Sequence, residues 1–425
     1  MIAAALLVAG VAWPGRLAFA AGCKWQARRA LENRDASRAL GWLRWAHAAL
    51  PHDGETEFLI ARAHRRQGQF DLVREHLKTA FTLNFSRRRL EREQWLALAQ
   101  TGQLREAEPH LAGLLTDPDN EADQICEAYV SGYLVNYRFR EALGLIEPWL
   151  ADYPRDPLPL LLRGKIYVIV IRFQEAERDL RRALELDPEN AEIAYELAEV
   201  LVVLKQPGDA ARFYERAAKS PTWKVRGQVG QGKCLRLAGN VAGARGMLEA
   251  ALAADPKRWE ALLELGRLAL ETQHAGAAAG LLNQAAQLNP LGLEVRYALA
   301  CALKASGHAK DAAPHFAFAD QARRDLAEAV RLADQVMLHP HDAESRYQIG
   351  SIYLKYGADE KGIYWLRSAL DETPGHKKAH AALAAYYEGR MEKSPAFAEL
   401  ARQHRQQAQA ARGENGEGRS ARGQP

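Results

Sequence analysis

The chain has 425 residues and a formal net charge of +4 at pH 7. This length exceeds one ordinary hydrophobic core, so the chain forms either several domains or a repeat array. The small positive charge does not by itself indicate a nucleic-acid partner. The four cysteines are far apart and form no CxxC pair, which excludes the usual spacing of zinc sites and disulfide frameworks.

The first segment of the chain, residues 1–19, is hydrophobic. The stretch from Ile2 to Trp13 carries no charge, and Arg16 then interrupts the apolar sequence. A membrane-spanning helix needs about 20 apolar residues, so this run is short for a complete span. We interpret the segment as a membrane anchor or a signal remnant, with a helix that caps the first repeat as the alternative. Membrane association through it is preferred over a soluble cytoplasmic location.

A repeat is faint in the units 20–53, 54–87, 88–122 and 123–156 and regular after them. Prolines then recur at intervals of about 34 residues, with one longer interval of about 50. They are Pro154, Pro188, Pro221, Pro256, Pro290, Pro340 and Pro374. Because proline cannot continue a helix, each of them marks the end of one two-helix unit.

Small and large residues recur in step with the prolines. The small column, in the first predicted helix of each unit, contains Gly164, Ala198, Gly232, Gly266, Ala300 and Gly350. The large column, in the second predicted helix, contains Leu180, Tyr214, Leu248, Leu282, Phe316 and Leu366. Glycine costs a helix about 1 kcal/mol relative to alanine, so its return at one column indicates close packing of the two helices.

This order of small, large and proline positions resembles the tetratricopeptide repeat. The match is strong over residues 157–292 and 293–376, weaker before residue 157, and a last unit, 377–411, lacks the closing proline. The resemblance implies an all-α fold, a right-handed α-solenoid of about eleven helical hairpins over residues 20–411, with the last unit as its polar cap. Residues 412–425 contain no large apolar side chain and are predicted to be a disordered tail.

One unit, residues 293–342, is longer than the others by about four helical turns. The added sequence, residues 320–337, contains neither glycine nor proline, so an elongated second helix over residues 309–338 is predicted. Leu326, Val330 and Ala333 form an apolar stripe along it. Two interpretations stay open: a tolerated insertion in the repeat array, or a ridge for docking or dimer contact.

No catalytic signature is present in the sequence. Neither a phosphate-binding glycine loop, nor a zinc-protease helix, nor a nucleophile elbow occurs in a suitable setting. The nearest approach to a ligand cluster is His308, His315, His339 and His341, which nothing in the sequence brings together. We therefore predict no enzyme activity, no cofactor and no metal site.

In a tetratricopeptide-like stack the first helices line the concave side, where aromatic and cationic residues fall in neighbouring columns. The predicted partner-binding residues are Arg62, Arg65, Lys165, Tyr195, Lys233, Arg236, Arg267, Tyr297, Lys304, Tyr347 and Lys355. Tyrosine supplies contact area, and cations suit an acidic peptide or a terminal carboxylate, so a protein or acidic peptide ligand is expected. The alternative is a solvated helix face whose cations pair locally, as Glu264 and Arg267 suggest.

These features predict a non-catalytic protein–protein interaction scaffold or adaptor that binds a partner segment in its concave groove. A membrane-anchored architectural or assembly factor is the alternative. An RNA-binding helical repeat protein is disfavoured, because base-reading residues do not recur at fixed positions. The asparagines of the family's carboxylate-clamp type are not found, and the sequence does not indicate an oligomeric state.

Overall fold

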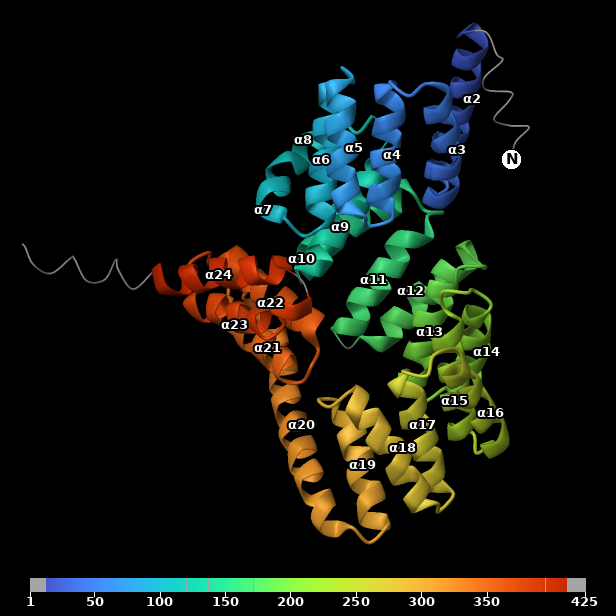
Figure 1. Cartoon of the computed structure of the whole chain (residues 1–425), viewed down its shortest axis with the longest axis vertical. Helices are drawn as coiled ribbons and strands as arrows, with labels where there is room; N and C mark the ends of the chain where they lie inside the picture. The colour runs from blue at the N-terminus through green and yellow to red at the C-terminus, as the bar shows by residue number, and fades with distance from the viewer. Residues whose placement is uncertain (1–12, 120, 137, 171, 394, 411–425) are drawn as a thin grey trace, which may run out of the picture. The chain divides into compact units, whose positions relative to one another are not determined.

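The structure is a computed structural model that describes residues 13–119, 121–136, 138–170, 172–393 and 395–410, and all regular structure in these residues is helical (Figure 1). In this part of the chain the helices pair in sequence into eleven hairpins, each with a first and a second helix. The all-α repeat solenoid predicted from the sequence is confirmed. The chain divides into two compact units, Met1–Tyr133 and Leu134–Pro425.

The first unit has one irregular hairpin, the third. Its helices are α2 (Trp13–Glu32), α3 (Ala36–Ala49), α4 (Gly54–Arg66), α5 (Phe70–Thr82), α6 (Arg87–Gln100), α7 (Leu104–Ala107), η1 (Glu108–His110) and α8 (Leu111–Thr116). The second helix of the third hairpin is split into α7, η1 and α8 around Pro109, because proline lacks the N–H group and clashes with the preceding turn. His110 in this break stacks on Trp95, with ring centroids 3.9 Å apart.

The second unit contains the regular hairpins. Helix α9 (Ala122–Val135) runs across the division between the units, and α10 (Phe139–Asp152), α11 (Pro157–Ile169), α12 (Phe173–Leu186), α13 (Ala191–Val203), α14 (Pro207–Ala218), α15 (Lys224–Leu237) and α16 (Val241–Ala254) follow. The remaining helices are α17 (Trp259–Glu271), α18 (Ala275–Leu288), α19 (Leu293–Ala305), α20 (Ala309–Leu338), α21 (Ala343–Lys355), α22 (Asp359–Glu372), α23 (Lys377–Glu388), η2 (Met391–Lys393) and α24 (Pro395–Ala410).

The structure describes only the last part of the hydrophobic segment at the start of the chain. Helix α2 begins at Trp13, inside the hydrophobic segment 1–19 that the sequence set apart, while residues 1–12 lie outside the described residues. Among the helices that the structure describes, none combines the length and apolar character needed to cross a membrane. The predicted disordered tail, 412–425, also lies outside the described residues.

Packing within each hairpin follows the small and large columns. A Cβ atom added to Gly232 would lie 2.6 Å from Cγ of Leu248, and one added to Gly164 would lie 2.9 Å from Cγ of Leu180. Leu248 and Leu180 are fully buried, as are Tyr214, Leu282 and Leu366 in the same column. The small residue therefore lets the second helix approach, and the large residue fills the space between the helices.

Most of the described turns within hairpins share one backbone conformation. The chain takes a positive φ just after the first helix, at Gly68 (72°) and at Gly239 (76°). Glycine adopts this left-handed region without steric cost. In three hairpins the same turn is made by Arg34 (56°), Lys205 (60°) and Gln273 (63°), so the repeat keeps its turn where it has lost the glycine.

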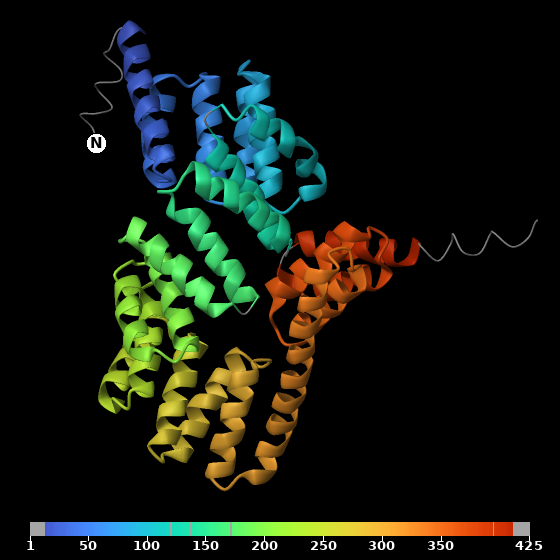
Figure 2. The ribbon, with the colours of Figure 1, turned by 180° about the vertical axis from the view of Figure 1, so that it is seen from behind.

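The elongated unit contains one continuous helix. α20 runs from Ala309 to Leu338 without interruption, although Pro314 lies near its start. In Figures 1 and 2 its N-terminal part lies beside α19 and its C-terminal part leads to α21. Asp325, near its middle, accepts hydrogen bonds from Lys355 Nζ and Tyr356 Oη of the next hairpin, each at 2.6 Å. One long helix thus serves as second helix for α19 and as a packing surface for α21.

Candidate functional site

The second unit has a pocket of about 240 Å³ on its first helices. Four consecutive first helices, α13, α15, α17 and α19, contribute to it. Its lining residues are Tyr195, Glu199, Arg226, Val229, Gly230, Lys233, Arg258, Trp259, Glu260, Leu263, Glu264 and Glu294. Two of the eleven predicted residues, Tyr195 and Lys233, therefore lie in one site.

The aromatic side of this pocket is Tyr195. Its half-buried ring packs against Trp223 at a centroid distance of 4.8 Å and meets Tyr214 edge-on at 5.7 Å. Burial and the neighbouring Glu199 carboxylate raise the pKa of the Tyr195 hydroxyl, so it stays protonated at neutral pH. Glu199 also accepts a hydrogen bond from the Tyr214 hydroxyl at 2.7 Å, which fixes the carboxylate at the pocket wall.

Most carboxylates around the pocket already have cationic partners. Glu264 accepts hydrogen bonds from Arg236 Nε and Arg267 Nη1, each at 2.8 Å. Arg267 also donates to Glu294 at 2.9 Å. Lys233, in contrast, forms no hydrogen bond or ion pair with any described residue. The Lys233 ammonium is therefore available to a ligand, while Glu199, bonded to the Tyr214 hydroxyl, keeps its negative charge at the pocket wall.

Arg62 and Arg65 lie on α4 in the first unit and are buried. Their side chains are 8% and 1% exposed, and both guanidinium groups bond to the buried Glu93 carboxylate of α6, from Arg62 Nε at 3.1 Å and Arg65 Nε at 2.5 Å. Arg62 also pairs with Glu121. Both guanidinium groups are already paired with Glu93, so these two residues join α4 to α6 and hold neighbouring hairpins together.

The other predicted residues of α11 and α19 differ in exposure. Lys165 on α11 donates to Glu192 of α13 at 2.5 Å. Tyr297 on α19 is 45% exposed and meets Phe316 edge-on, with the Arg323 guanidinium 5.6 Å from its ring centre. Lys304, at the end of α19, is exposed to solvent.

Tyr347 and Lys355 lie on α21, beyond the long helix α20. Lys355 is bonded to Asp325, and the Tyr347 ring lies 5.6 Å from Lys378 Nζ and 5.4 Å from the His376 ring. Successive first helices pack on one another from α11 to α19, and α23 packs on α21. Outside its own hairpin with α22, α21 packs mainly on the second helix α20. The predicted column of eleven residues is therefore divided among separate groups of first helices.

One feature of these ion pairs was missed in the sequence. A cation in the second half of a first helix repeatedly bonds to a glutamate 27 or 28 residues later, at the start or in the middle of the next first helix. These pairs are Arg28–Glu55, Arg65–Glu93, Lys165–Glu192, Arg236–Glu264 and Arg267–Glu294. In each pair at least one partner also suits the helix dipole: Glu55, Glu192 and Glu294 lie in first turns, and Arg65 and Arg236 lie in last turns. We call this set the inter-repeat ion pairs.

The four histidines near the elongated unit have separate surroundings. His315 bonds to Arg296, His341 pairs with Glu372, and His308 contacts Ser306. Burial and the charge of Arg296 lower the pKa of His315. Across the residues that the structure describes, no three His, Cys, Asp or Glu side chains are grouped as a metal would require.

Comparison with known proteins identifies the repeat. Two tetratricopeptide repeat family models match, over residues 172–220 and 231–292. The crystal structure of PilW, a type IV pilus biogenesis factor, is similar over 47% of this chain and 92% of that chain, with 25% identity and a TM-score of 0.43. The anaphase-promoting complex tetramer Cut9–Hcn1 (15% identity, 86% of each chain, TM-score 0.37) and the human IFIT1 dimer with m7Gppp-AAAA (17% identity, 83% and 90%, TM-score 0.42) are also similar. No curated protein matches the sequence.

Proposed function

We propose that this chain, which is a tetratricopeptide repeat protein, is a non-catalytic scaffold that holds an acidic segment of a partner protein against the first helices α13–α19. The repeats support a protein-interaction role in general. The observation that carries the finer proposal is the pocket of about 240 Å³ in which Tyr195 and an unpaired Lys233 lie together. An aromatic ring supplies an anchor of low entropy cost, and a free ammonium selects for a carboxylate.

Two cations of the pocket, Lys233 and Arg226, support an acidic ligand. Glu264 and Glu294 are already bonded to arginines, so they repel a carboxylate less than their formal charge suggests. Arg226 is exposed at the rim, with its guanidinium 5.3 Å from the Trp223 ring centre. A partner segment with two acidic residues would therefore meet Lys233 and Arg226 without breaking an existing ion pair.

The test is affinity capture of partners with charge-reversed chains. We expect Lys233→Glu combined with Arg226→Glu to lose the partners that the unmodified chain captures, because the free cations become repulsive. The matched control is Lys219→Glu, an exposed lysine at the end of the second helix α14, which should capture them normally. Equal capture by all three chains, with unchanged circular dichroism, would contradict the assignment to this pocket.

A further inference from the structure

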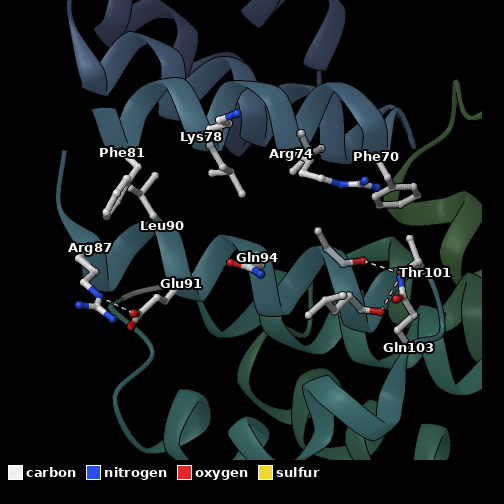
Figure 3. Close-up of a pocket in the computed structure, with 14 residues that line it drawn as sticks. Phe70, Arg74, Lys78, Phe81, Arg87, Leu90, Glu91, Gln94, Thr101 and Gln103 are labelled. Carbon is white, nitrogen blue, oxygen red and sulfur yellow. Dashed lines mark hydrogen bonds and ion pairs between the residues drawn. The ribbon is translucent and has the colours of Figure 1, made fainter. Parts of the chain in front are cut away.

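A second surface, in the first unit, lies between the neighbouring helices α5 and α6. It is a groove of about 550 Å³ that shares no residue with the pocket on α13–α19. Figure 3 shows Phe70, Arg74, Lys78 and Phe81 along α5 and Arg87, Leu90, Gln94 and Thr101 along α6, with the two helices running in opposite directions.

Both walls of the groove carry apolar stripes at helical spacing. Phe70, Val73, Leu77 and Phe81 line it from α5, and Leu90, Ala97 and Leu98 line it from α6. Val73 and Leu90 are buried and form the floor, whereas Phe81 is 60% exposed. The α5 stripe extends over about 16 Å, or three helical turns. The apolar side chains of a third helix could pack between the side-chain ridges of these two antiparallel helices.

The polar rim of the groove is mostly positive. Arg74, Lys78 and Arg87 line it, against the single carboxylate of Glu91. Glu91 is paired with Arg87 at 2.7 Å, and Arg74 lies 3.4 Å from the fully exposed Asp71. Lys78 forms no hydrogen bond or ion pair with the described residues. The α5 side of the groove therefore offers two exposed cations beside an apolar floor.

We propose that the α5–α6 groove binds an amphipathic helix of a partner protein, whose apolar stripe lies on the groove floor and whose flanking acidic residues face Arg74 and Lys78. Helices of this kind bind apolar grooves through residues at i, i+3 or i+4, and i+7. The groove length fits about three turns of such a helix. Its rim charge selects an acidic flank over a basic one.

The test uses two designed helical peptides of about four turns with the same leucine stripe, one flanked by glutamates and the other by lysines. Fluorescence anisotropy measures their binding to the full chain. We expect the acidic peptide to bind at least about tenfold more tightly than the basic one. Arg74→Glu with Lys78→Glu should reverse that preference, and Phe81→Glu should abolish binding of both peptides. These three residues are exposed, so the fold should persist, as circular dichroism would check.

The matched control is Arg182→Glu with Arg212→Glu, which makes the same charge change on the exposed faces of α12 and α14. It should leave the preference for the acidic peptide intact. Equal binding of both peptides, no binding at millimolar concentration, or an effect of the control equal to that of the groove variant would overturn the proposal. Light scattering of the chain alone adds one more outcome: a dimer that Phe81→Glu dissociates would assign the groove to a second copy instead.

Discussion

At the scale of single residues, the glycines of this chain serve opposite purposes. Gly232 lies against Leu248, so that any added Cβ atom would overlap the leucine side chain. Gly246, one helix later in the same hairpin, is exposed and has no atom within 4 Å of an added Cβ. The first glycine is required by packing, and the second only weakens its helix.

These two glycines make a prediction of opposite sign. Gly232→Ala should destabilise the hairpin by about 1–3 kcal/mol, because the overlap with Leu248 forces the helices apart. Gly246→Ala should instead stabilise it by about 0.5–1 kcal/mol, since alanine is the better helix former. Thermal unfolding followed by circular dichroism measures both changes. Equal shifts in the same direction would show that the packing column is misplaced.

At the scale of helices, α4 and α6 are joined through one buried carboxylate. Burial alone would raise the pKa of Glu93, but the charges of Arg65 and Arg62 and their hydrogen bonds outweigh it and hold the pKa at about 2. An ordinary glutamate in the unfolded chain titrates near 4.5. The folded form therefore gains stability from this group above about pH 4.5 and loses it as the pH falls toward 2.

We expect Glu93→Gln to cost about 3 kcal/mol at pH 7, because two buried guanidinium groups lose their shared partner. The difference between the variant and the unmodified chain should shrink below pH 4.5, since the glutamate is then neutralised as unfolding proceeds. Denaturant titration at several pH values measures this. The control is Glu91→Gln on the same helix, whose exposed pair with Arg87 should contribute less than about 1 kcal/mol. A pH-independent difference for Glu93→Gln would contradict the assignment.

The limits of sequence-based prediction are also visible in these helices. The repeat period predicted the hairpins. Gly164, Gly232 and Gly350 each lie against a leucine of the second helix, and a small residue that recurs at one interval can be recognised in the sequence. The roles of Arg62 and Arg65 were not predictable from their column, because their partner Glu93 lies on another hairpin. The spacing of 27 or 28 residues was present in the sequence and would have revealed such pairs. The α5–α6 groove could not be predicted in this way. Apolar residues at helical spacing form the same sequence pattern whether they line a groove or pack into a core.

At the scale of the whole molecule, a repeat stack is held mainly by contacts between neighbours, so its end hairpin is its least supported part. In the last hairpin, His380 Nδ1 lies 2.8 Å from His404 Nδ1, and the His404 ring stacks on Tyr387. Burial, together with the charges of His380 and Arg367, lowers the pKa of His404 to about 4. In the folded hairpin His404 therefore binds a proton only near pH 4, whereas in the unfolded chain it does so near pH 6.5.

Acidification should therefore open the end of the stack first. As the pH falls from about 6.5 toward 4, the free energy of opening α23–α24 should decrease, because only the open form takes up the proton. Hydrogen exchange, corrected for its intrinsic pH dependence, measures this opening. His404→Gln should remove the dependence, and His339→Gln, at an exposed position on another turn, should leave it unchanged. A uniform loss of protection along all hairpins would argue against a local cause.

The inter-repeat ion pairs give the stack a direction. In helix α17, Glu264 accepts a hydrogen bond from Arg236 of the preceding first helix, and Arg267 donates one to Glu294 of the following first helix. A repeat of this kind carries both halves of the connection, an acceptor for its predecessor and a donor for its successor. Duplicating such a repeat would thus leave each arginine and glutamate of these pairs with a partner. Losing part of it would leave one of them without a partner in each neighbouring repeat. For a repeat like α17–α18, which carries both halves, adding a complete unit therefore keeps these ion pairs matched.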